Sequence, residues 1–272
     1  MEATDALLDQ VVEVCPLPAT TQRVLALTSN DSSGIPEVSR VISTDPALAT
    51  SVLRVANSAA YGMGRVDRLE QAVLRLGLRE LHNLAAAMAL FAAFRNKAEH
   101  KLQLHELCVT SGSVAHRLAK ETKLEVPSTA FTCGLLSEIG AMACLVFDGK
   151  DYVALWQAAN GNPDLRAQLE QERYGATSFA IGQRFLQRNS LPDNICTAVG
   201  ADLSQIQPDA EALAKLTLFA RHVPPLALLL NKDIPALRQR LDELAERVAL
   251  QQVDGTRLLE AWTRMAPSEA FS

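Results

Sequence analysis

The stretch that decides the fold runs from residue 45 to residue 77. It reads DPAL at 45–48, LRVANSAAYG at 53–62, LEQAV at 69–73 and LG at 76–77. Asp45 followed by Pro46 predicts a helix start, because an aspartate side chain accepts from the first backbone N–H groups and proline at the first helical position has no N–H to lose. Gly77 predicts the end of a helix over 69–76. The stretch therefore predicts short helices joined by tight turns.

Helical periodicity continues through nearly the whole chain, with breaks at proline, glycine and asparagine. The pattern predicts helices over 17–28, 35–43, 45–60, 69–76, 78–94, 104–122, 127–146, 151–159, 163–172, 178–187, 193–199, 208–221, 234–250 and 254–265. The sequence contains no persuasive strand pattern and no internal repeat. We therefore expect an all-α fold with two helical lobes, residues 1–95 and 96–205, followed by a helical C-terminal extension, residues 206–272.

The composition is that of an ordinary globular protein, with 48% hydrophobic and 21% charged residues in a chain of 272. The formal net charge of −5 argues against binding that depends on neutralising phosphates, so no DNA partner is expected. The acidic residues Glu2, Asp5 and Asp9 do not fit a signal peptide. Apolar runs such as 226–230 are far shorter than a membrane span, so no membrane association is expected.

The cysteines indicate a reducing compartment. There are five of them, Cys15, Cys108, Cys133, Cys144 and Cys196, and none forms a CxxC pair. The odd number and the spacings match neither a disulfide framework nor a zinc site. Most lie among apolar residues, so we expect buried, reduced thiols and a cytoplasmic location.

The 45–77 stretch resembles the HDOD family, helical modules related to the HD-type metal phosphohydrolases. The resemblance covers about residues 12–205. Within it, residues 134–140 read GLLSEIG, where an HD phosphohydrolase has GLLHDIG. The resemblance implies a hydrolase scaffold that has kept the fold-defining residues and lost the His-Asp pair.

The same resemblance locates the other metal ligands of an HD hydrolase. An early histidine falls near Thr110, the His-Asp pair falls on Ser137 and Glu138, a later histidine falls on Ser178, and a final pair falls around residues 201–202. Only Glu138 and Asp202 carry a carboxylate, and two carboxylates without imidazole are too few for a polarising metal site. We therefore expect no metal, no cofactor and no catalysis, with Glu138 held by a salt bridge or by Ser178 or Thr110.

Two groups of residues in the first lobe are open to two interpretations. Asn57, Ser58 and Tyr61 suit helix capping and packing, although their polar groups could also bind a ligand. Five arginines fall in one segment and are either a solvated mixed-charge surface or an anion site with paired guanidinium forks; they are Arg54, Arg65, Arg68, Arg75 and Arg79.

The resemblance implies a non-catalytic bacterial signal-transduction or regulatory module that acts by protein–protein interaction. Its partner would be supplied in trans, as a kinase, a receiver or a cyclic-dinucleotide enzyme or effector, and would contact the groove between the lobes or the Ala/Leu-rich tail. One alternative is a sensor that binds a small anion such as a cyclic dinucleotide. A more remote alternative is a metal-dependent phosphohydrolase with altered ligands. The sequence identifies neither the partner nor the oligomeric state.

Overall fold

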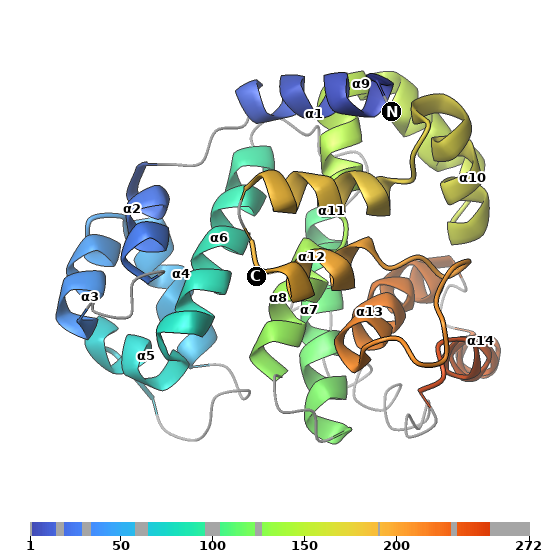
Figure 1. The fold of residues 1–272 in the computed structure, drawn as a ribbon. Coiled ribbons are helices and arrows are strands. Elements are labelled where there is room, and N and C mark those ends of the chain that lie inside the picture. Colours follow the sequence, from blue (N-terminus) through green and yellow to red (C-terminus); the bar gives the residue numbers. More distant parts are fainter. Residues whose placement is uncertain are drawn as a thin grey trace. The chain divides into compact units, whose positions relative to one another are not determined.

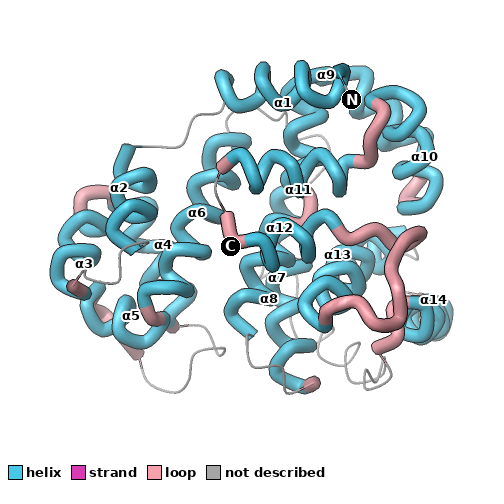
Figure 2. The backbone as a smooth tube through the Cα atoms, viewed as in Figure 1, coloured by secondary structure: helices cyan, strands magenta, loops and turns pink. Residues whose placement is uncertain are grey.

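The chain is described in a computed structural model that covers residues 2–14, 19–28, 34–57, 65–95, 104–122, 127–189, 191–229 and 233–250. Within these ranges the backbone is helical apart from short loops and turns, and no strand occurs (Figure 2). The expected all-α fold is confirmed. The chain divides into two compact units, one made of residues 15–96 and the other of residues 1–14 together with 97–272.

The smaller unit is a bundle of short helices packed on one long helix. Its elements are α2 (Ala19–Thr28), α3 (Ile35–Ser43), α4 (Pro46–Ala56), α5 (Leu69–Leu76) and α6 (Leu78–Arg95) (Figure 1). α6 packs against α2, α4 and α5, while α3 packs against α4 and α5. Small side chains at 85–87 are fully buried and allow the neighbouring helices to approach α6 closely.

The turn residues of the 45–77 stretch hold the ends of these helices. Asp45 Oδ1 accepts from the Leu48 backbone N–H at 3.0 Å, so it caps α4, which begins at Pro46 as expected. Gly77 follows α5 with a φ of +81°, and its N–H donates to the Val73 carbonyl at 2.8 Å. A side chain at position 77 would be strained in that backbone conformation, which explains the glycine.

The larger unit has a helical centre surrounded by further helices. Its elements are α1 (Glu2–Val14), α7 (Leu104–Glu121), α8 (Pro127–Leu136), α9 (Ile139–Ala159), α10 (Pro163–Tyr174), α11 (Ser178–Arg188), α12 (Asp193–Gly200), α13 (Ala212–Leu229) and α14 (Ile234–Arg247). α7, α8 and α13 pack on one another, and α9 packs against α1, α10 and α11 (Figure 1).

The compact units differ from the expected division at both ends of the chain. The pattern did not predict α1, whose Leu7, Leu8 and Val11 are fully buried. α1 packs on α9 and α11 of the larger unit, and its Thr4 hydroxyl donates to the Tyr174 carbonyl at 3.1 Å. The extension helix α13 packs against α7, α8 and α12, so it belongs to the same unit as residues 97–205.

Helix boundaries differ from the expected ones mainly around the GLLSEIG stretch. The single helix expected over 127–146 is broken by a turn at Ser137 and Glu138. The break expected between the helices over 127–146 and 151–159 is a kink instead, because Gly149 has a φ of +48° and the helix continues to Ala159. α13 begins at Ala212 rather than 208 and extends to Leu229. The helix expected over 254–265 lies outside the described residues.

The expectation that apolar runs are far too short for a membrane span does not hold for α8 and α9. The segment Thr129–Ala159 contains a window with a mean hydropathy of 1.8, which is long and apolar enough by composition alone. However, 83% of that window is buried inside the folded unit. This degree of burial is typical of a core helix, so the high hydropathy is explained by packing against the other helices of the unit.

Candidate functional site

Four of the positions that the resemblance assigns to metal ligands lie on packed elements of the larger unit. Thr110 is on α7, Ser137 and Glu138 form the turn between α8 and α9, and Ser178 is the first residue of α11. All four are buried. Close helix approaches hold these elements together.

Glycines make these approaches possible. A Cβ at Gly134 would lie 2.5 Å from the Ser111 carbonyl oxygen of α7, and a Cβ at Gly140 would lie 1.8 Å from the Ser178 carbonyl oxygen of α11. Neither position can therefore accept a side chain without moving a backbone. The two glycines flank the Ser137–Glu138 turn, so the turn is held between α7 and α11.

Glu138 is held by an arginine that the sequence pattern did not single out. Arg166, on α10, places Nη1 3.1 Å from Glu138 Oε2 and Nη2 3.4 Å from Glu138 Oε1. The side chains of Arg166 and Glu138 are 8% and 2% exposed, so this is a buried, two-pronged ion pair. The expected salt bridge of Glu138 is thus present, and its partner is Arg166 rather than Ser178 or Thr110.

A second carboxylate, Glu170, lies one helical turn after Arg166 and is completely buried. Its Oε1 is 3.6 Å from Arg166 Nε and accepts from the Tyr152 hydroxyl at 2.8 Å. Its Oε2 accepts from the backbone N–H of Ser178 at 2.7 Å. Glu170 therefore neutralises Arg166 and also satisfies a donor at the start of α11, where a negative charge is favourable.

Arg166 also packs against aromatic rings. Its guanidinium carbon lies 4.4 Å from the ring centroid of Trp156 and 5.1 Å from that of Phe179. Burial alone would lower the pKa of Arg166, but the charges of Glu138 and Glu170 outweigh it and raise that pKa. Arg166 is therefore a permanent cation inside the unit.

A second buried arginine comes from the C-terminal extension. Arg221, on α13, lies 3.6 Å from the Phe179 ring centroid and donates to the carbonyls of Val199, at 3.0 Å, and Ala201. These carbonyls are at the end of α12, where backbone acceptors lack helical partners. Burial lowers the pKa of Arg221 to about 9, which still leaves it cationic at neutral pH. The extension thus supplies a charged side chain to the site region.

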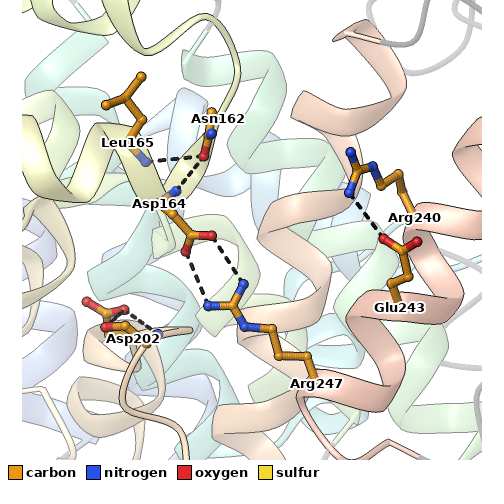
Figure 3. Close-up of polar contacts among 8 residues, drawn as sticks. Asn162, Asp164, Leu165, Asp202, Arg240, Glu243 and Arg247 are labelled. Atoms are coloured by element: carbon orange, nitrogen blue, oxygen red, sulfur yellow. Dashed lines mark hydrogen bonds and ion pairs between the residues drawn. The ribbon is translucent and has the colours of Figure 1, made fainter.

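Asp202, the other carboxylate expected near the metal position, has a local role. Its Oδ1 accepts from both the backbone N–H and the hydroxyl of Ser204, each at 2.8 Å (Figure 3). The same figure shows Arg247 of α14 reaching Asp164 at 3.2 and 3.4 Å, next to the Asn162 cap of α10. The extension is therefore tied to the helix that carries Arg166 and Glu170.

Comparison with known proteins identifies the family. The model of the HDOD domain matches residues 14–203. The chain belongs to the HDOD family. This membership supports a regulatory or signalling role in general terms.

Solved HDOD-like structures share the fold over nearly their full length. A candidate phosphohydrolase from Shewanella amazonensis SB2B superposes with a TM-score of 0.75 at 25% identity, covering 97% of this chain and 96% of that one. An HDOD domain protein of unknown function from Geobacter sulfurreducens gives a TM-score of 0.72 at 19% identity, covering 99% and 95%.

A curated relative matches a shorter stretch. An uncharacterized protein of Treponema pallidum (strain Nichols) is 28% identical over 137 residues, which make up 50% of this chain and 27% of that protein. This HDOD chain therefore matches only about a quarter of that relative's length.

A metal of the kind that HD hydrolases use does not fit the residues of this HDOD site. Thr110, Ser137 and Ser178 offer neutral hydroxyls, which are weak ligands beside histidine and carboxylate. Glu138 is already paired with the Arg166 guanidinium through both of its oxygens, so its carboxylate is not open to a dication. Among the described residues no group of three or more His, Cys, Asp or Glu side chains is placed to hold a metal ion.

In the HDOD motif of the smaller unit, Asn57 acts on the backbone. Its Nδ2 donates to the carbonyls of Leu53 at 2.9 Å and Val66 at 2.6 Å, and its Oδ1 accepts from the Val66 N–H at 2.6 Å. The amide thus joins the end of α4 to the chain before α5, in agreement with the capping interpretation. Ser58 and Tyr61 lie outside the described residues.

The five arginines of this unit do not act alike. Arg75 donates to the Ala56 carbonyl at 3.1 Å, and Arg68 lies 3.9 Å from Glu70 in a mainly exposed pair. Arg54, Arg65 and Arg79 are exposed. Ligand binding by these arginines stays a prediction.

The site residues that sequence reasoning missed are Tyr152, Arg166, Glu170 and Arg221. Two signals were available in the sequence. Arg166 and Glu170 have the i,i+4 spacing of a helical ion pair. Arg221 directly follows the mainly apolar stretch 216–220, where an arginine indicates a buried charge with dedicated partners. Neither signal predicts that Arg166 and Arg221 both lie over the Phe179 ring.

Proposed function

We propose that this HDOD chain is a non-catalytic regulatory module, which acts in signal transduction by binding another protein. The observation that carries the proposal is the buried Arg166–Glu138 ion pair, at the place where an HD hydrolase has its metal-binding His-Asp pair. An arginine cation in contact with Glu138 supports the loss of the metal chemistry on which an HD hydrolase depends.

The chemical reason is the role of the metal in phosphate ester hydrolysis. A bound divalent ion lowers the pKa of a water molecule and stabilises negative charge in the transition state. Arg166 could stabilise negative charge, but it cannot supply a hydroxide nucleophile. Glu138 and Glu170, each paired with Arg166 and almost completely buried, are also poorly placed to act as a general base for a water molecule on an open substrate.

The partner is proposed to be a signalling protein supplied in trans, such as a kinase, a receiver or a cyclic-dinucleotide enzyme or effector. The location is proposed to be the cytoplasm. A cytoplasmic location is supported by the buried free thiols of four cysteines, Cys108, Cys133, Cys144 and Cys196. Burial, with the nearby charge of Glu138, raises the pKa of the Cys108 thiol, so this cysteine is suited to packing rather than to nucleophilic chemistry.

The proposal is tested by assaying hydrolysis on the full chain with Mn²⁺, Fe²⁺ or Mg²⁺. Substrates would include cyclic dinucleotides, nucleoside phosphates and a chromogenic phosphodiester. We expect no turnover above the protein-free blank with any metal. Affinity capture of the same protein from its native cells should recover a signalling protein in near-stoichiometric amount.

The test variant is Glu138→Gln, and the matched control is Glu243→Gln, which changes an exposed glutamate of α14 paired with Arg240. Metal-dependent turnover that Glu138→Gln abolishes and Glu243→Gln leaves intact would overturn the proposal and establish a hydrolase with altered ligands. Turnover that neither variant changes would instead indicate a contaminating enzyme, which a repeat preparation by a different route would remove.

A further inference from the structure

Three of the buried charged side chains near the Ser137–Glu138 turn are joined by ion pairs. Glu138 and Glu170 are the carboxylates, and Arg166 lies between them with nitrogen atoms 3.1 and 3.6 Å from their oxygens. The three side chains come from the α8–α9 turn and from α10, and none is more than 8% exposed. One cation thus joins two acidic groups from different elements inside the unit.

We propose that the Arg166 guanidinium takes the place of a divalent cation at this site, and that removing it uncovers a cation site formed by Glu138 and Glu170. The inference deepens the proposed function and rests on its premise that the natural chain holds no metal here. The inference explains why the unit is stable without a metal ion, because the Arg166 guanidinium supplies the positive charge.

The shape of the guanidinium suits this role. Its two terminal nitrogens lie near the two oxygens of Glu138, and Nε lies 3.6 Å from Glu170 Oε1, so a single planar group is within ion-pair distance of both carboxylates. The Trp156 ring at 4.4 Å provides a further favourable surface for the positive charge. A lysine would offer the charge without this fork.

Removal of Arg166 would leave two buried carboxylates without their cation. Arg221 is not a replacement, because its guanidinium donates to the carbonyls of Val199 and Ala201 at the end of α12. Tyr152 and the Ser178 N–H would still hold Glu170 in place. A buried carboxylate that has lost its cationic partner either takes up a proton or binds another cation. Carboxylate oxygens are hard ligands, which suit Mn²⁺.

The experiment compares thermal unfolding of the full chain in EDTA and in millimolar MnCl₂, with bound Mn²⁺ measured by electron paramagnetic resonance. The variants are Arg166→Ala, and Arg166→Ala combined with Glu138→Gln and Glu170→Gln. The natural chain should unfold at the same temperature in both buffers. Arg166→Ala should unfold about 10 °C lower in EDTA, because a buried pair has lost one partner.

In MnCl₂ the Arg166→Ala variant should regain about half of that loss and bind about one Mn²⁺ per chain, because a ligand that binds only the folded state stabilises it. The triple variant should show no response to Mn²⁺. Arg166→Lys should unfold between the natural chain and Arg166→Ala, again without a response to Mn²⁺, because it keeps the charge.

An Arg166→Ala chain that is destabilised and indifferent to Mn²⁺ would overturn this inference and leave the proposed function standing, since the latter concerns the natural chain. A natural chain that loses stability in EDTA and regains it in Mn²⁺ would overturn both. If Arg166→Ala is recovered unfolded, it would be refolded from denaturant in each buffer. Refolding in MnCl₂ but not in EDTA supports the inference. Failure to refold in either buffer, when the triple variant does refold, contradicts it.

Discussion

In the HDOD motif, single polar side chains join backbone segments by hydrogen bonds, and Asn57 is the clearest example. All of its described hydrogen bonds go to backbone groups, of Leu53 on α4 and of Val66 before α5. Its residue type and its position near a helix end predicted such bonds. The sequence could not predict Val66 as the partner, because that contact depends on how the chain between residues 57 and 66 returns.

The prediction at the residue scale concerns the isosteric change Asn57→Asp. A carboxylate oxygen would replace Nδ2 and face the carbonyl oxygens of Leu53 and Val66, so two hydrogen bonds would become repulsive contacts. We expect the free energy of unfolding of the smaller unit to fall by about 2–3 kcal/mol. Urea unfolding followed by circular dichroism would measure it.

Asn189→Asp is the matched control, because Asn189 Nδ2 makes one hydrogen bond, to Phe185 at 2.9 Å. Its cost should be about 1 kcal/mol. Equal losses for the two variants would show that the Asn57 amide has no special part in the turn, and would reopen the ligand-binding interpretation of this motif.

At the scale of elements, the break between α8 and α9 is the feature that sequence periodicity did not predict. Residues 127–146 read as one apolar helix by periodicity, although Gly134 and Gly140 within it have low helix propensity. The turn at Ser137 and Glu138 is explained by tertiary contacts instead: Gly134 lies against α7, Gly140 lies against α11, and Glu138 is paired with Arg166. Local pattern and tertiary packing disagree at this point, and packing prevails.

The change Gly140→Ala separates these two influences by the sign of its effect. Helix propensity alone would make alanine stabilising by about 1 kcal/mol. The Cβ would lie 1.8 Å from the Ser178 carbonyl oxygen, so we expect a loss of at least about 3 kcal/mol in the free energy of unfolding. Urea unfolding of the two chains side by side would measure the difference.

Gly34→Ala is the control for this measurement, because its Cβ would meet only Pro36 Cδ at an ordinary 3.6 Å. Its effect should stay within about 1 kcal/mol of zero. A Gly140→Ala chain as stable as Gly34→Ala would mean that α9 and α11 do not approach each other this closely.

At the scale of the whole molecule, the sequence predicted the helical class and most helix starts. It did not predict the buried charge network around Glu138, because Glu138, Arg166, Glu170 and Arg221 come from the α8–α9 turn, α10 and α13, which are separate in the chain. Periodicity reports which face of an element is buried, and it contains no information about which buried faces meet.

The extension shows the same limit. The HDOD family match ends at residue 203, yet α13 places Arg221 beside Phe179 and α14 places Arg247 at Asp164. The last described helices therefore complete the unit that contains the HD-like site. Their role followed only from the three-dimensional contacts.

Whether an arginine stands in for the metal of this HDOD unit is best decided by anomalous diffraction from crystals of the natural chain soaked in MnCl₂. We predict no anomalous peak at bonding distance from Glu138 or Glu170, with the Arg166 guanidinium seated between the two carboxylates. A strong manganese peak at bonding distance from Glu138, with the Arg166 side chain turned away, would contradict this prediction. That result would support the alternative that this HDOD chain is a metal-dependent hydrolase.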